Sequence, residues 1–306
     1  MRLEFIQPGS PTDAFWSQIA MFRCKLDALG EPYKSARLVL CLGMSDSPRR
    51  VPSRWAPWFK NIELLWADSV ADEGDLIYRA VDRSADISFI GDADTLLMER
   101  LPEAFLQDCV GKPAIRAVIA HYQPPLRPYA KSTIPPLPTH EAMWAAISDR
   151  ILGKLIELPY PYTLLDQPEI RCPFYVNHGF IAATPDLMKE FGRLQAEVLA
   201  DVKAVIDNEF CHQIAISFAV ARGALPHEAL PMRFNFPNDP ICDRLHPEEL
   251  RHVLLMHYLR TEIFDRHKIF AERAEFDRFM GLTLSGSNAI FRDNVRALTG
   301  GDYPFS

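Results

Sequence analysis

Two aspartates one residue apart, Asp92 and Asp94, are the residues whose type and spacing point most directly to chemistry. They follow Gly91 and the apolar run Ile87–Ile90 in the segment ADISFIGDADTLL. Alternate side chains of an extended chain point the same way, so both carboxylates can face one cation. Carboxylate oxygens are ligands of hard divalent cations. The segment is therefore either a metal site at the end of a strand or a structural turn that carries two acids.

The flanking sequence favours the metal site. A D-x-D pair alone is a weak signal, because aspartate is common enough for such pairs to arise by chance in 306 residues. Here apolar residues stand on both sides of the acids, with Leu96, Leu97 and Met98 after them. The pair is therefore expected at the end of a buried strand, where cation sites with oxygen ligands occur.

The elements that must position this pair alternate between strands and helices. The runs RLEFI, ARLVLCLG and NIELLWAD are typical of short buried strands, whereas DAFWSQIAMFRCKLDALG and DEGDLIYRAVDRS show apolar residues at helical spacing. This alternation predicts an α/β fold with a mixed, mostly parallel sheet flanked by helices. Asp68, at the end of NIELLWAD, then shares the carboxyl edge of the sheet with Asp92 and Asp94, and ligands bind at that edge in such folds.

The second half of the chain continues this pattern after a proline-dense segment, HYQPPLRPYAKSTIPPLPTH, which is expected to be a stiff loop. A strand FYVNHGFIAAT with a break at Asn177–Gly179 precedes a helix that starts at Pro185. IDNEFCHQIAISFAVARG predicts a helix capped by Asp207 or Asn208. HVLLMHYL predicts a further strand, and the tail from Thr261 predicts an amphipathic helical segment.

Composition narrows the class of protein. The net charge of −7 and the pI of about 5.7 argue against a nucleic-acid surface, which needs a basic stripe. The first residues lack the apolar region of a signal peptide, and no apolar run is long enough for a transmembrane segment. The six cysteines are scattered without a CxxC pair and predict reduced core residues in a cytoplasmic protein. The oligomeric state is not indicated.

Several common signatures are absent from the sequence, namely GxGxxG, GxxxxGK[ST], HExxH and GxSxG. One alternative rests on DADTLL, which resembles the signature of haloacid-dehalogenase-like phosphatases, whose first aspartate attacks phosphorus. In those enzymes, however, the motif ends the first strand, and here it follows about three strand-like runs. A phosphatase-like hydrolase is therefore kept as the alternative reading of this segment.

Most of the chain resembles the metal-dependent nucleotide-sugar glycosyltransferases of the GT-A fold, in particular the glycogenin-like and bacterial lipopolysaccharide-type galactosyl- and glucosyltransferases. The helix before the D-x-D pair carries Arg79 and Arg83, like the arginine helix of that family. FYVNHGFIAATPDLMKEF resembles their N-S-G strand, CHQIAISFAVARGALPHEALPMRFNFPN their Q-x-A-L-N-x-A and L-P-x-x-F-N segments, and LLMHYL their late H-Y strand.

The sequence departs from the family pattern at three places. His178 replaces the serine of N-S-G, and His212 replaces an acidic residue before Gln213. After His257, Leu259 and Arg260 stand in the region where the family has a glycine and a lysine.

The resemblance implies a hexosyltransferase that moves a sugar from a nucleoside diphosphate sugar, with UDP-sugars favoured, to a small-molecule or glycan acceptor. It implies that Mn²⁺ or Mg²⁺ bridges the phosphates and is held by Asp92, Asp94 and His257. Residues 1–306 would form one GT-A-like domain, with a nucleotide-binding half (1–118), an acceptor half (119–260) and a helical tail (261–306).

Other residues receive roles from the same resemblance. Arg79 or Arg83 would contact phosphate, unless they are ordinary surface arginines, and Asp68 would accept from ribose or base, unless it caps the next helix. Asn177 and Gly179 would meet the sugar, with a turn or bulge as the alternative. The remaining candidates lie at one helix start and include the general base that an inverting enzyme needs: Asp207, Glu209, His212 and Gln213.

A third hypothesis is a catalytically inactive protein that keeps the fold and binds a sugar nucleotide. The residues that set it apart from an active enzyme are His178 and His212, because they replace the family's own residues.

Overall fold

The computed structural model describes residues 1–43, 49–68 and 73–305. Its strands are β1 (Leu3–Gly9), β2 (Arg37–Leu42), β3 (Glu63–Trp66), β4 (Ile87–Ile90), β5 (Thr95–Leu97), β6 (Ile115–Ile119), β7 (Tyr160–Pro161), β8 (Arg171–Cys172), β9 (Val176–Ala183), β10 (His227–Ala229), β11 (Phe236–Pro237) and β12 (Leu255–His257). Its α-helices are α1 (Asp13–Ala28), α2 (Glu73–Arg79), α3 (Glu103–Gly111), α4 (His140–Leu152), α5 (Pro185–Lys203), α6 (Cys211–Gly223), α7 (Pro240–Leu245), α8 (Pro247–Leu250), α9 (Arg273–Gly281) and α10 (Gly286–Thr299).

The main sheet of the described chain has seven strands in the order β10-β6-β9-β4-β1-β2-β3. Every neighbouring pair is parallel except those that involve β9, which runs antiparallel to both β4 and β6. The reversal matters for the site. It brings the start of β9, which carries Asn177 and Gly179, to the edge where β4 and β6 end. The predicted α/β class with a mixed, mostly parallel sheet is confirmed.

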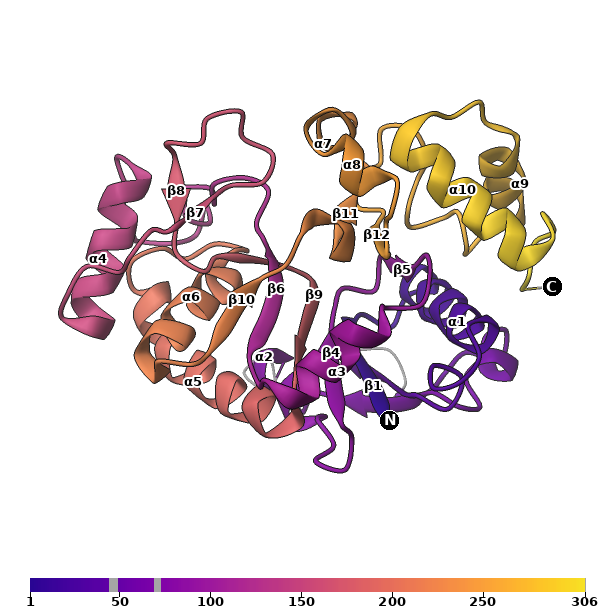
Figure 1. Cartoon of the computed structure of the whole chain (residues 1–306), viewed down its shortest axis with the longest axis horizontal. Helices are drawn as coiled ribbons and strands as arrows, with labels where there is room; N and C mark the ends of the chain where they lie inside the picture. Colours follow the sequence, from indigo (N-terminus) through magenta and orange to yellow (C-terminus); the bar gives the residue numbers. More distant parts are fainter. Residues whose placement is uncertain (44–48, 69–72, 306) are drawn as a thin grey trace.

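Strand side chains alternate between two cores, as the period of two requires. Phe5, Leu38 and Phe89 point into a core with α1 and the C-terminal helices, while Ile6 and Ile90 point into a second core with α5 and α6. Figure 1 shows α4, α5 and α6 on one side of the sheet and α1, α9 and α10 on the other. All six cysteines are unpaired, and five of them are buried.

A small second sheet, β11-β12-β5, connects a late part of the chain (β11 and β12) to the D-x-D segment, which β5 follows. β12 pairs antiparallel with β5, with His257 opposite Thr95. Behind this sheet, Phe291 of α10 is fully buried and stacks on Tyr258 with a ring separation of 4.6 Å. Lys25 of α1 donates to Asn294 of α10 at 2.8 Å. The C-terminal helices therefore form part of the core that supports the edge of the site.

The structure corrects four expectations about element boundaries. The tail becomes helical at Arg273, so residues 261–272 hold no helix. α2 ends at Arg79, and Asp72, where this helix was expected to begin, lies outside the described residues. α6 begins at Cys211 rather than after a cap at Asp207 or Asn208. β9 continues through Asn177–Gly179, although its register with β6 shifts there.

In the described part of the chain, every helix is too short or too polar to cross a lipid bilayer. The division of the chain into two halves and a tail stays a prediction.

Candidate functional site

The turn after β4 holds the two aspartates in a fixed backbone frame. The Gly91 amide donates to the Ile6 carbonyl of the neighbouring strand at 3.2 Å. The Asp92 carbonyl accepts hydrogen bonds from the Thr95 hydroxyl at 2.7 Å and from the Gln7 amide at 3.1 Å. These bonds come from β1 and β5, so both strands fix the position of the turn.

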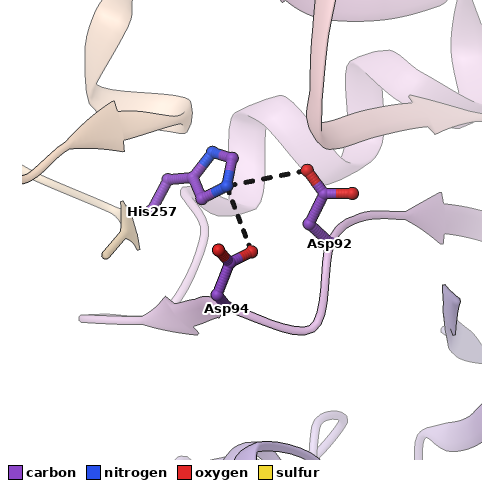
Figure 2. A group of neighbouring side chains, drawn as sticks. All are labelled: Asp92, Asp94 and His257. Atoms are coloured by element: carbon purple, nitrogen blue, oxygen red, sulfur yellow. Dashed lines mark hydrogen bonds and ion pairs between the residues drawn. The ribbon is translucent and has the colours of Figure 1, made fainter. Parts of the chain in front are cut away.

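His257, at the end of β12, lies beside the same turn although it is far away in the sequence. Its Nε2 lies 3.2 Å from Asp94 Oδ1 and 3.6 Å from Asp92 Oδ2, and Figure 2 shows the imidazole facing both carboxylates. The Tyr258 amide donates to the Asp94 carbonyl at 3.0 Å and holds β12 beside the turn. One ligand atom from each of the three residues lies within 4.8 Å of the others.

This group fits a divalent cation. Two carboxylate oxygens and one imidazole nitrogen suit Mn²⁺ or Mg²⁺, and two like charges this close need a compensating cation. Asp92 remains 35% exposed, so one side of the group faces the adjoining cavity and leaves room for ligands other than protein atoms.

Arg266 is a site residue that the sequence analysis missed. Its Nη1 forms an ion pair with Asp94 Oδ2. Arg260, which stands in the region of the family's lysine, pairs instead with Asp239 at 2.6 Å and lies against the ring of Tyr122. Arg266 stands in the segment that was expected to be helical, and no motif distinguishes it from the other arginines of the tail.

The three residues shift one another's proton affinities. Burial raises the pKa of Asp92 to about 6. Burial also acts to raise the pKa of Asp94, but the charge and hydrogen bond of His257 and the charge of Arg266 outweigh it, so that pKa is lowered. Burial acts to lower the pKa of His257, and the two carboxylates reverse this into a raised pKa. The positive charges of His257 and Arg266 therefore compensate the two carboxylates. A bound cation would take over this role.

Behind the imidazole, a buried polar network includes Asn177, Gly179 and Asn235. The side-chain oxygen of Asn177, Oδ1, accepts hydrogen bonds from the Gly179 backbone amide and from Asn235 Nδ2, both at 2.8 Å. A Cβ atom on Gly179 would lie 2.4 Å from Asn235 Oδ1 and 2.5 Å from His257 Nδ1. Among the described residues, neither of these two buried atoms has a hydrogen-bond partner. Glycine is required at position 179 because the imidazole and the amide occupy the space of a side chain.

Two cavities meet at Asp92. The first, which we call the charged cavity, has a volume of about 430 Å³. The second, the isoleucine pocket, has a volume of about 250 Å³ and lies on the α2, α5 and α6 side of the sheet. Polar residues that line the charged cavity are Ser10, Gln18, Asp92, Asp94, His257, Arg266 and His267. Residues that line the isoleucine pocket include Ile77, Ile90, Ile181, His178, Gln195 and His212.

Only one of the four candidate catalytic residues, three of them candidates for the general base, lines these cavities. His212 borders the isoleucine pocket, whereas Asp207, Glu209 and Gln213 border neither cavity. Asp207 and Glu209 lie in the turn before α6, where the Asp207 carbonyl accepts from the Tyr129 amide at 2.7 Å. The roles predicted for Asp207, Glu209 and Gln213 therefore have no geometric support here.

The two arginines predicted to contact phosphate line neither the charged cavity nor the isoleucine pocket. Arg79 ends α2, and Arg83 lies in the segment between α2 and β4. Arg83 is 73% exposed and lies 3.3 Å from Asp186. The hydrophobic pattern had correctly indicated a helix, but it could not indicate which residues of the helix face the site.

Asp68 is also separate from the cluster. Its side chain is 80% exposed and pairs with Arg49 at 2.8 Å, and it borders neither cavity. This ion pair lowers the pKa of Asp68. The prediction that Asp68 accepts a hydrogen bond from ribose or base has no support from this placement.

Comparison with known proteins finds solved structures with a similar fold. The sequence itself matches no family model and no curated protein. An active-site mutant of LgtC is 13% identical over 97% of this chain and 95% of that chain, with a TM-score of 0.50. The galactosyltransferase LgtC in complex with donor and acceptor sugar analogs is 15% identical over 84% and 87%, with a TM-score of 0.46. Mouse xyloside xylosyltransferase 1 in its apo form is 10% identical over 85% and 98%, with a TM-score of 0.48.

The chain has the fold of the GT-A-type glycosyltransferases. This fold also bears on the phosphatase alternative. The D-x-D turn follows β4, which lies in the middle of the sheet and is not the first strand of the chain. DADTLL therefore lacks the position that its phosphatase reading requires.

Proposed function

We propose that the protein is a metal-dependent glycosyltransferase that moves a hexosyl group from a nucleoside diphosphate sugar to a small-molecule or glycan acceptor. The observation that carries this proposal is the convergence of Asp92, Asp94 and His257 at the carboxyl edge of a GT-A-type sheet. Arg266 adds a cation at the same place.

The chain's own residues would divide the work between binding and charge compensation. Asp92, Asp94 and Nε2 of His257 would hold Mn²⁺ or Mg²⁺, with a UDP-sugar as the favoured donor. The bound cation would offset the charge that develops on the diphosphate as it leaves. Arg266 would turn from Asp94 to a phosphate oxygen, because the cation replaces it as the partner of that carboxylate.

In the transfer step, the bond between the anomeric carbon and the diphosphate oxygen breaks, and a bond to the acceptor oxygen forms. The acceptor proton leaves with the nucleoside diphosphate or with a base. His212 is the one candidate base that borders the isoleucine pocket. Burial lowers its pKa to about 4, so its imidazole is neutral at pH 7 but is a weak base.

Calorimetric titration tests the proposal. UDP and GDP are titrated into the protein with and without Mn²⁺, and we expect binding that depends on the metal. Asp94→Asn should weaken that binding at least about tenfold, whereas Asp149→Asn, an exposed aspartate on α4, should leave it unchanged. Metal-independent binding, or no binding of either nucleotide, would contradict the proposal.

A turnover assay separates an enzyme from an inactive binding protein. Release of the nucleoside diphosphate from a donor sugar in the presence of Mn²⁺ supports the enzyme. Metal-dependent nucleotide binding without release from any common donor supports the inactive protein, for which His212 in place of an acid is the specific observation.

A further inference from the structure

The isoleucine pocket is the part of the site that differs most in chemistry from the charged cavity. Three isoleucine side chains line it, and two of them, Ile90 and Ile181, are at most 4% exposed. Ile77 of α2 faces them and is half-buried. No lysine, arginine or glutamate lies among the described residues that line the pocket, and its single charged group is Asp92.

Asp92 connects this pocket to the charged cavity, since its side chain lines both. On the proposed function, the diphosphate binds on the charged side, beside Arg266 and the metal ligands. The group that is attached to the phosphates and extends past Asp92 then enters the isoleucine pocket. A nucleoside diphosphate sugar has a nucleoside on one phosphate and a sugar on the other. On this proposal the larger charged cavity, of about 430 Å³, takes the nucleoside, and the smaller isoleucine pocket, of about 250 Å³, takes the sugar.

The pocket offers few hydrogen-bonding groups. His178 and His212 have no hydrogen bond from their rings to other described residues, and their low pKa values of about 4, caused by burial, keep both neutral. The Gln195 amide nitrogen already donates to the His212 carbonyl at 2.7 Å, which leaves its carbonyl oxygen. Two imidazoles and one carbonyl oxygen are thus available for sugar hydroxyls, together with the Asp92 carboxylate and the Tyr78 hydroxyl of the same lining.

Two consequences follow for the sugar. A carboxylate on the sugar would be buried beside Asp92 without an opposite charge, which is strongly unfavourable. A hydroxyl against the isoleucines would lose its hydrogen bonds to water, whereas a methyl group at the same place would gain from burial.

We propose that the isoleucine pocket selects a neutral donor sugar that carries a methyl group, either at C6, as in a 6-deoxyhexose, or in an acetamido group. This inference rests on the proposed function and narrows the donor. A hexose must place a hydroxyl where the isoleucines offer no hydrogen bond, whereas a 6-deoxyhexose or an N-acetylhexosamine can place its methyl group there.

The test compares donors that differ only in the sugar. Calorimetry with Mn²⁺ measures the affinities of UDP-glucose, UDP-N-acetylglucosamine and UDP-glucuronate, and of GDP-mannose and GDP-6-deoxymannose. We expect a methyl-bearing donor to bind about tenfold more tightly than its hydroxylated partner, and UDP-glucuronate to bind most weakly. The pair that shows the preference identifies the source of the methyl group.

A saturation-transfer NMR experiment on the wild-type protein provides a second measurement, in which the methyl protons should receive the strongest saturation. Ile77→Ser should reduce the tenfold preference to about threefold or less and leave the affinity for the bare nucleotide unchanged. Ile151→Ser, a half-buried isoleucine on α4 outside the pocket, should change neither.

The outcomes distinguish the two proposals. If UDP and GDP bind with metal but the hydroxylated donors or UDP-glucuronate bind as tightly as the methyl-bearing ones, the inference is wrong and the proposed function stands. If neither nucleotide binds, both are wrong.

Discussion

Replacing Gly179 with alanine should impair metal binding by displacing His257. The new Cβ would lie 2.5 Å from His257 Nδ1 and 2.4 Å from Asn235 Oδ1, whereas ordinary contact begins at 3.4 Å. Each side chain must therefore recede by about 1 Å, twice the tolerance of about 0.5 Å for a working site. Both residues are at most 4% exposed, so neither side chain can move into solvent.

This displacement has two measurable effects. Overpacking should lower the free energy of unfolding by about 1–3 kcal/mol. The affinity for Mn²⁺ should fall by about 10- to 100-fold, because Nε2 of His257 loses its alignment with Asp92 and Asp94. The backbone at Gly179 does not have a positive φ, so the added methyl group acts through contact and not through backbone strain.

Thermal unfolding without metal measures the first effect, and calorimetric titration of Mn²⁺ with UDP measures the second. Gly281→Ala is the matched control, because a Cβ atom there would contact nothing within 4 Å. Wild-type Mn²⁺ affinity in a folded Gly179→Ala variant would refute the reasoning that His257 is held in place by the absence of a side chain at position 179.

Three further predictions concern charge, pH and packing. Arg266→Ala should weaken metal-dependent UDP binding about tenfold and Arg266→Lys less, as measured by calorimetry, and equal affinities would argue against a phosphate contact. Because burial lowers the pKa of His178 and His212 to about 4, the unfolded chain binds more protons than the folded one below about pH 6.5. The free energy of unfolding should therefore fall as the pH falls from about 6.5 to about 4. In thermal melts, the double variant with His178→Asn and His212→Asn should show a smaller fall. An unchanged fall would mean that other groups cause the pH dependence. Phe291→Ala should cost about 3–5 kcal/mol in chemical unfolding, and a cost below about 1 kcal/mol would contradict the packing role of α10.

Much of the sheet could be predicted from local patterns. Ile87–Ile90 and Arg37–Leu42 are short apolar runs bounded by turn residues, and both form strands buried on their two faces. The D-x-D turn was found for the same reason, since it follows such a run directly. The small sheet was foreseen only as a strand around His257, and its pairing with β5 could not be derived from local sequence.

The residues that were missed or misplaced depend on tertiary geometry. Arg79 lies on a helix as expected and Arg83 lies after its end, but helical periodicity does not indicate which residues of a helix face the site. Arg266 lies in a non-helical segment whose backbone contacts a distant part of the chain, because the Gln18 side-chain amide donates to the Arg266 carbonyl at 3.2 Å. Such contacts join distant parts of the chain, and no short-range pattern records them.

The assembly of the candidate metal site has a consequence for the order of folding. His257 follows Asp94 by 163 residues and Arg266 follows it by 172, so the cluster closes loops that include most of the chain. Closing loops of this length has an entropic cost that must be met before the ligands can cooperate. An ion that binds only the completed cluster then stabilises the folded chain at a late stage of folding. The melting temperature should rise with the concentration of that ion. During synthesis, no metal affinity of this kind can arise until the C-terminal segment has emerged and docked, so metal binding would report that the whole molecule has folded.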